Sequence, residues 1–295
     1  VVGSTFLIGG AIYYFLPVLG LEIPLIFALV FGALISPTDP IAVLGILKQV
    51  GAPKSLETKM AGESLFNDGV GVVVFSVILG IALGHGEVSF SHISFLFFEE
   101  AIGGALFGGI IGWVVYKLLK SIDHYEVEIL LTLALVLGGY SLASYLHLSG
   151  PIAMVVAGLL IGNHGKAFAM SENTHTQLFS FWSLIDEFLN SVLFVLIGLE
   201  VLILSLSIQY VIVGLLVIPI VLLSRGVCVG ISVNLMKSVH TFSPHVVKIL
   251  TWGGLRGGIS VALALSIPES ESRDLIIVMT YIVVVFSILV QGLTM

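Results

Sequence analysis

The chain consists of long apolar runs that are separated by short polar segments. A helix needs about 20 apolar residues to cross a bilayer, so these runs predict about ten transmembrane helices. Their approximate ranges are 2–20, 22–47, 56–84, 91–120, 125–147, 150–162, 173–200, 205–236, 244–267 and 272–294. The sixth range is short, and we expect that helix to tilt or to join its neighbour. The continuity of the runs argues against a transmembrane β-barrel, whose strands alternate over about ten residues.

Composition supports a membrane protein. Of the 295 residues, 58 % are hydrophobic and 10 % are charged, whereas soluble domains carry about 25 % charged residues. This excludes an ordinary soluble enzyme, a disordered chain and a disulfide scaffold. The net charge of −7 does not suit a nucleic-acid partner. Cys228 lies in an apolar run, and we interpret it as a packing residue. The predicted fold class is an all-α polytopic membrane protein, with residues 1–295 as one transmembrane domain.

Basic residues predict the orientation. With ten helices, eight lysines fall on one side of the membrane, Arg273 falls on the other, and Arg225 and Arg256 lie within helices. The eight are Lys48, Lys54, Lys59, Lys117, Lys120, Lys166, Lys237 and Lys248. Loops rich in Lys and Arg stay in the cytoplasm, so we expect a multi-pass protein of the cell (inner) membrane with this side cytoplasmic. The chain starts without Met and stops directly after an apolar run, so we expect a piece of a longer protein.

The second predicted helix carries a polar interruption, Ser36-Pro37-Thr38-Asp39-Pro40. Two prolines three residues apart remove backbone donors and clash with the preceding turn. A simple proline kink is the plainer interpretation. However, irregular backbone at membrane depth is tolerated only where it is buried or lines a cavity. With Thr38 and Asp39 inside the break, we favour an ion site.

The third predicted helix concentrates polar side chains on one side. Ser64 and Asp68 are four residues apart and share a helix face, and Glu63 and Asn67 share the adjoining one. An interfacial loop is the alternative. It is disfavoured because the apolar run 70–83 is too short to span the bilayer without Asp68.

Two arginines lie inside the last apolar runs. Arg225 is deep in the eighth predicted helix, where an unpaired charge is costly, so a buried carboxylate partner is expected. Arg256 lies among the glycines of Gly253-Gly-Leu-Arg-Gly-Gly258, which predict a second break and close backbone approach. Paired interrupted helices indicate an inverted-repeat transporter. The sequence has no nucleotide-binding loop, so ATP-driven pumping is unsupported.

Several motifs together resemble the sodium/proton exchanger family of the NhaP and NHE type. They are Ser36-Pro-Thr-Asp-Pro-Ile-Ala-Val43, Gly62-Glu-Ser-Leu-Phe-Asn-Asp-Gly69, Gly150-Pro-Ile-Ala-Met-Val-Val-Ala-Gly158, the stretch 190–200 and Gly253-Gly-Leu-Arg-Gly-Gly258. The resemblance implies a thirteen-helix antiporter fold with crossed discontinuous helices, and a homodimer in full length. The ion-carrying core would lie mainly in 22–84 and 205–267. This chain would begin at the fourth helix and lack a further carboxylate that close relatives carry on the third.

The resemblance also implies roles for individual residues. Asp68 would bind the ion or the proton, with oxygen ligands for Na⁺ from Ser64 and Thr38, and Asn67 and Asp39 would belong to the same ion-binding group. Asp39 and Arg256 would balance the half-helix ends, and Glu63 would pair with Arg225. Chemistry agrees, because a hard monovalent cation prefers oxygen ligands and an apolar site favours the neutral form of a carboxyl group. A proton and Na⁺ would then compete for Asp68. Asn67, in place of a second carboxylate, predicts electroneutral exchange of one proton for one cation.

The sequence therefore predicts a secondary antiporter, not an enzyme, that exchanges Na⁺ or Li⁺ for H⁺ by alternating access and regulates intracellular pH and sodium. Its partners would be monovalent cations, protons and the lipid bilayer, with no cofactor and no nucleic acid. A K⁺/H⁺ antiporter on the same scaffold is the nearest alternative. An intramembrane aspartyl protease would use Asp39 and Asp68, but it would need a Gly-x-Gly-Asp setting that is absent here. An ion channel is a further alternative, although no carbonyl filter is visible.

Overall fold

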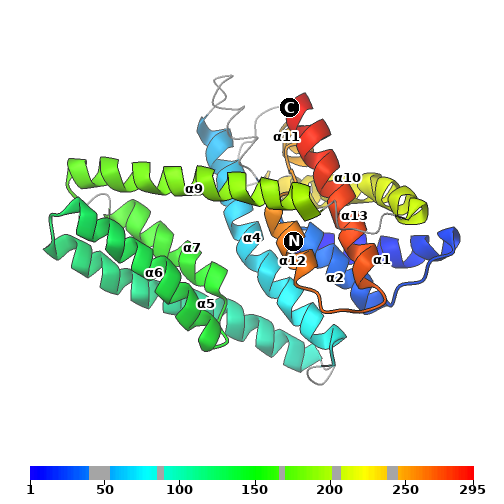
Figure 1. Ribbon diagram of the computed structural model, residues 1–295, viewed down its shortest axis with the longest axis horizontal. Helices are drawn as coiled ribbons and strands as arrows, with labels where there is room; N and C mark the ends of the chain where they lie inside the picture. Colours follow the sequence, from blue (N-terminus) through cyan, green and yellow to red (C-terminus); the bar gives the residue numbers. More distant parts are fainter. Residues whose placement is uncertain (40–53, 85–89, 166–169, 201–206, 238–244) are drawn as a thin grey trace. The chain divides into compact units, whose positions relative to one another are not determined.

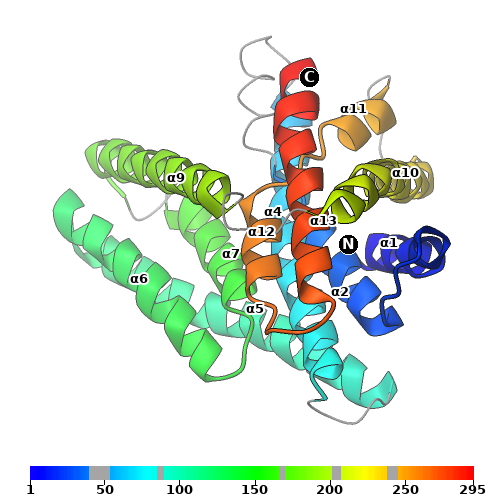
Figure 2. The ribbon, with the colours of Figure 1, turned by 45° about the vertical axis from the view of Figure 1, so that its right-hand side comes forward.

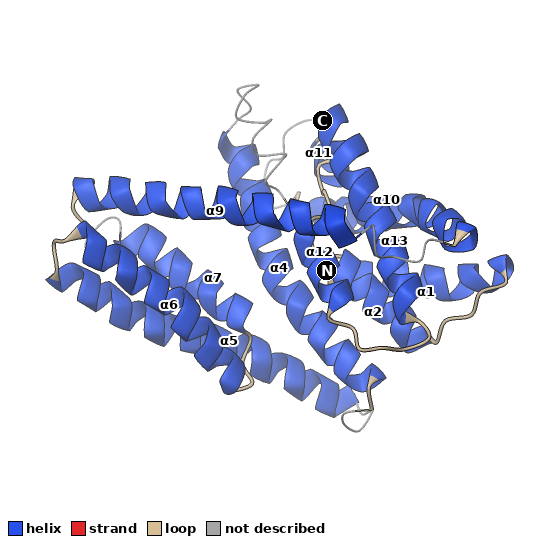
Figure 3. Ribbon diagram, viewed as in Figure 1, coloured by secondary structure: helices blue, strands red, loops and turns tan. Residues whose placement is uncertain are grey.

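The computed structural model describes residues 1–39, 54–84, 90–165, 170–200, 207–237 and 245–295, with backbone only at 55, 56, 90–94 and 200. Within these segments all regular structure is helical (Figure 3). One isolated antiparallel bridge joins Asp39 to Leu255. The predicted all-α class is confirmed. Pro40 and Lys48 lie outside the described residues.

The helices follow the predicted runs closely (Figure 1). They are α1 (Val2–Phe15), α2 (Leu25–Ile35), α4 (Lys54–Ala82), α5 (Phe90–Ser121), α6 (Tyr125–Tyr145), α7 (Gly150–Leu160), α9 (Glu172–Glu200), α10 (Ile208–Met236), α11 (Val246–Trp252), α12 (Gly258–Leu265) and α13 (Arg273–Phe286). Short turns extend three of them: a 3₁₀ turn, Leu16–Leu19, follows α1, and a π turn, Ile161–Gly165, follows α7. Beyond α13 come a π turn, η3 (Ser287–Gln291), and a 3₁₀ turn, η4 (Gly292–Thr294).

Seven helices in the described part of the chain are long and apolar enough to cross a membrane, and α2 and α7 are shorter apolar helices. Two predicted helices differ from a simple span. The second ends at Ile35, directly before the Ser36-Pro37 step. The ninth is divided into α11 and α12, which Figure 2 draws as separate segments. Both interruptions fall where proline or clustered glycine weakens a helix.

The chain divides into two compact units, which we call unit 1 (Val1–Glu87 with Leu196–Met295) and unit 2 (Val88–Val195). In unit 1, α1 packs against α2 and α10, α2 packs against α4, and α13 packs against α10 and α12. Gly32 allows α1 and α2 to approach closely, because a Cβ there would overlap the carbonyl oxygen of Thr5. Small residues serve the same purpose in membrane helix pairs generally. The predicted ion-site core, 22–84 and 205–267, belongs to unit 1.

In unit 2, α5 packs against α6 and α7. Gly104, Gly108 and Gly112 repeat every four residues on α5, and a Cβ on any of them would meet the α7 segment at Ser149, Ala153 or Ala157. This is the small-residue spacing that brings membrane helices together.

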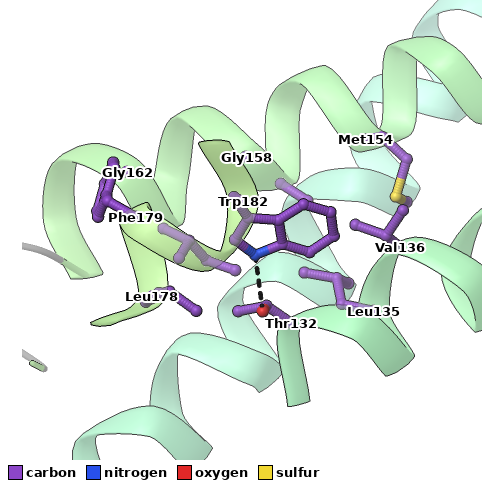
Figure 4. A pocket seen from close by; sticks show the side chains of 11 residues that line it. Thr132, Leu135, Val136, Met154, Gly158, Gly162, Leu178, Phe179 and Trp182 are labelled. Atoms are coloured by element: carbon purple, nitrogen blue, oxygen red, sulfur yellow. Dashed lines mark hydrogen bonds between the residues drawn. The ribbon is translucent and has the colours of Figure 1, made fainter. Parts of the chain in front are cut away.

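Unit 2 also holds a pocket of about 250 Å³ among α6, α7 and α9 (Figure 4). Trp182 forms one wall, and its Nε1 donates a hydrogen bond to Thr132 Oγ1 at 3.0 Å. The described residues that line the pocket carry no charge. This pocket therefore offers no carboxylate for a cation.

Candidate ion-binding site

The two interrupted helices meet in unit 1. After α2 the chain continues without helical structure to Asp39, whose backbone N–H donates to the carbonyl oxygen of Leu255 at 2.9 Å. Leu255 lies in the gap between α11 and α12, so this hydrogen bond forms the antiparallel bridge between the two breaks. The interruptions expected from the sequence therefore cross each other.

Glycine is required at this crossing. A Cβ on Gly257 would overlap the carboxylate of Asp39, and a Cβ on Gly254 would overlap the guanidinium of Arg225. On the neighbouring helix, a Cβ on Gly71 would overlap the ring of Pro37. The glycines thus let two charged side chains and one proline ring lie directly against backbone.

Charges of opposite sign face the half-helix ends. Arg256 is 2 % exposed, and its Nη1 donates to the carbonyl oxygens of Ser36 and Pro37 at 2.5 and 2.7 Å. These carbonyls follow α2, where the helix dipole favours a cation. The carboxylate of Asp39 lies against Gly257, which caps the N-terminus of α12, where the dipole favours an anion. Each of the two charges therefore lies at the helix end whose dipole favours its sign.

The polar face of α4 lies beside the break in the second helix. Ser64, 2 % exposed, donates its hydroxyl hydrogen to the carbonyl oxygen of Thr38. Asn67 Nδ2 lies 3.4 Å from Thr38 Oγ1 and donates to it. Asp68 is one helical turn beyond Ser64 and is partly buried, and its carboxylate interacts electrostatically with that of Asp39. The structure thus gathers carboxylate, hydroxyl and carbonyl oxygens in one place.

Glu63 and Arg225 form the expected ion pair. Arg225 Nη2 lies 2.9 Å from Glu63 Oε1, with exposed side-chain fractions of 8 % and 28 %. Glu63 Oε1 also accepts from Asn67 Nδ2 at 3.4 Å, and Arg225 Nε donates to the carbonyl oxygen of Leu250 at 2.9 Å. The pair therefore connects α4, α10 and α11 beside the crossing.

A cavity of about 540 Å³ reaches this cluster from within unit 1. Glu63, Asn67 and Arg225 line it together with Lys59 and Cys228. Cys228, which we had interpreted as a packing residue, thus lies on a cavity wall. The cavity therefore reaches the edge of the polar cluster at Asn67.

Sequence reasoning missed Ser287 and Gln291, which are buried in η3 and contact the second break. Arg256 N–H donates to Ser287 Oγ at 2.8 Å, and Gln291 Nε2 donates to the carbonyl oxygen of Trp252 at 2.7 Å. Two polar residues four apart in the last apolar run were the only available signal.

Known proteins resemble the whole chain. The family profile described as "Sodium/hydrogen exchanger, transmembrane" matches residues 1–295. The Na(+)/H(+) antiporter NhaP of Pseudomonas aeruginosa is 54 % identical over 99 % of this chain and 70 % of its own length. The Na(+)/H(+) antiporter NhaH of Halobacillus aidingensis is 39 % identical over 99 % of this chain and 71 % of its own.

A solved structure has the same fold. The sodium proton antiporter MjNhaP1 from Methanocaldococcus jannaschii superposes with a TM-score of 0.77 at 24 % identity, covering 98 % of this chain and 75 % of its own. This likeness concerns the fold, and the profile match and the 54 % identity decide the family. The chain is an integral multi-pass membrane protein that belongs to the sodium/hydrogen exchanger family.

Proposed function

We propose that this protein exchanges Na⁺ or Li⁺ for H⁺ across the membrane, with Asp68 as the carboxylate that both ions use in turn. The observation that carries the proposal is the placement of Ser64 against Thr38 and of Asp68, one turn further along α4, within electrostatic reach of Asp39 at the two crossed helix breaks. Membership of the exchanger family and 54 % identity to a Na(+)/H(+) antiporter support it.

In this mechanism Na⁺ binds to the carboxylate of Asp68, the hydroxyl of Ser64 and an oxygen of Thr38. All three groups are hard oxygen ligands, which suit an alkali cation. Among the described residues no side chain donates a hydrogen bond to Asp68, so its carboxylate oxygens remain available to the cation. A proton at Asp68 neutralises the carboxylate and excludes the cation. Because one carboxylate holds either ion, each cycle moves one cation against one proton.

The surrounding charges keep the site suitable for one positive charge. Arg256 neutralises the carbonyl end of α2, and Glu63 neutralises Arg225. Asn67 contributes an amide where a second acid would add a second proton, so we propose electroneutral exchange. Alternating access requires a path to each side, and the 540 Å³ cavity beside Asn67 serves as one of them.

We further propose that the Lys-rich loops face the cytoplasm and that the full-length protein is a homodimer in the cell membrane. In this setting the transporter regulates intracellular pH and sodium. These assignments rest on the distribution of basic residues along the chain and on the family resemblance.

Reconstitution tests the proposal. The full-length protein in proteoliposomes is given an outward gradient of Na⁺, Li⁺ or K⁺, and internal pH is followed with a dye. In the Na⁺ and Li⁺ experiments valinomycin and K⁺ set the voltage, and the K⁺ experiment is run without valinomycin. We expect proton flux with Na⁺ and Li⁺ that does not vary with voltage. Flux with K⁺ alone would establish the K⁺/H⁺ alternative, and cation flux without proton coupling would indicate a channel.

A further inference from the structure

We propose that Ser287 and Gln291 are positioning residues. Their side chains replace the helical hydrogen bond that the second break removes between the carbonyl of Trp252 and the N–H of Arg256, and they thereby hold the break in the conformation that the ion site requires. This inference rests on the proposed function. It concerns residues of η3 that do not belong to the ion-binding cluster itself.

The break between α11 and α12 removes the helical hydrogen bond between residues 252 and 256. In a continuous helix the carbonyl of residue 252 would accept from the N–H of residue 256, since these are four apart. Here the chain leaves the helix after Trp252, and Arg256 lies in the gap before α12. Arg256 is buried and Trp252 is half-buried, and an unsatisfied backbone group costs free energy where water is excluded.

Two side chains bridge this gap in one directed sequence. Arg256 N–H donates to Ser287 Oγ at 2.8 Å, and the Ser287 hydroxyl donates to Gln291 Oε1 at 2.7 Å. Gln291 Nε2 then donates to the carbonyl oxygen of Trp252 at 2.7 Å. Each donor meets an acceptor, so both orphaned backbone groups are satisfied through this relay of Ser287 and Gln291.

The two side chains of the relay are buried. Ser287 is 0 % exposed and Gln291 is 2 % exposed. The two lie four residues apart in a π turn, a feature that is often found at functional sites. Among the described side chains, no other group bonds the carbonyl of residue 252 or the N–H of residue 256. If it is lost, the break must close toward a helical hydrogen bond or leave two polar groups unpaired.

The relay acts on the ion site through Arg256. The backbone position of Arg256 decides whether its guanidinium reaches the carbonyls of Ser36 and Pro37, and these directly precede Thr38. A shift of the break would therefore move an oxygen ligand of the cation. Loss of the relay should weaken cation binding more than it slows turnover.

The test uses Gln291→Met and Ser287→Ala in the full-length protein. Each variant should raise the KM for Na⁺ about five- to tenfold, as expected for one or two buried hydrogen bonds, while maximal rate stays within about twofold. The double variant should be no worse than the stronger single one, because the two side chains act as one unit. Thr294→Val is the matched control. Exposed Thr294 accepts from the indole Nε1 of Trp252 and donates to the carbonyl oxygens of Val290 and Gln291, and it bonds neither the carbonyl of residue 252 nor the N–H of residue 256.

Three outcomes overturn the proposal: an unchanged KM, a loss of folded protein or maximal rate without a change in KM, or fully additive effects in the double variant. A second measurement does not depend on transport. Backbone hydrogen exchange in peptides that contain residues 253–257 should be faster in Gln291→Met than in Thr294→Val, and equal rates refute the relay. If the wild type exchanges no cation, the proposed function fails, and hydrogen exchange alone decides the relay.

Discussion

Removal of the Glu63 charge should destabilise the protein, because Arg225 would keep its charge and lose its carboxylate. Arg225 is 8 % exposed and lies 2.9 Å from Glu63. Breaking a buried ion pair from one side costs about 3–5 kcal/mol. Two features reduce this cost: Glu63 is 28 % exposed, and Arg225 retains its hydrogen bond to Leu250. For Glu63→Gln we therefore expect a loss of about 2 kcal/mol in the free energy of unfolding.

Thermal unfolding in detergent measures this loss. Tryptophan fluorescence reports on three residues, Trp113, Trp182 and Trp252. A destabilisation of this size should lower the Tm by about 3–6 °C. Glu269→Gln, which neutralises an exposed carboxylate between α12 and α13, should leave the Tm unchanged.

The double variant Glu63→Gln/Arg225→Met sharpens the test. It removes the orphaned cation together with its partner, so it should lose less stability than the sum of the two single variants. Equal Tm values for Glu63→Gln and the wild type would refute the reasoning. Strict additivity in the double variant would show that the two charges act separately.

Three further predictions concern the site. Asp68→Asn should reduce Na⁺-driven proton flux in proteoliposomes more than about 100-fold with an unchanged Tm, since the amide cannot take up the proton; retained flux would contradict this. Gly257→Ala should lower stability by about 1–3 kcal/mol, because its Cβ would overlap Asp39, whereas Gly10→Ala, with open space around it, should be neutral or better. The KM for Na⁺ should rise as the pH falls, because protons compete for Asp68, and a pH-independent KM would rule out competition.

The fold was largely predictable because a membrane imposes one strong rule. Backbone groups in lipid must bond within the segment, so each apolar run of sufficient length becomes a helix. The same rule located the breaks, since Pro37 and the glycines around Arg256 cannot continue a helix at low cost. The division into units 1 and 2 was not predictable, because it depends on packing among distant segments.

The site was predictable where a charged residue lies within an apolar run, because a charge there has a high free-energy cost. Glu63, Asp68 and Arg225 attract attention because each is a charge within apolar sequence. Ser287 and Gln291 did not, because a neutral serine or glutamine in an apolar run is common and its partner cannot be read from spacing. Their role emerges only when η3 is seen beside the gap between α11 and α12.

The central claim is that one carboxylate, Asp68, holds either Na⁺ or a proton. The direct measurement is proton release when Na⁺ is added to the purified protein in weakly buffered detergent solution. The account predicts that, at a pH low enough for the cation-free site to be protonated, one proton is released for each Na⁺ bound to the wild type and none in Asp68→Asn. Sodium binding to the wild type without proton release, or equal release from Asp68→Asn, would contradict it.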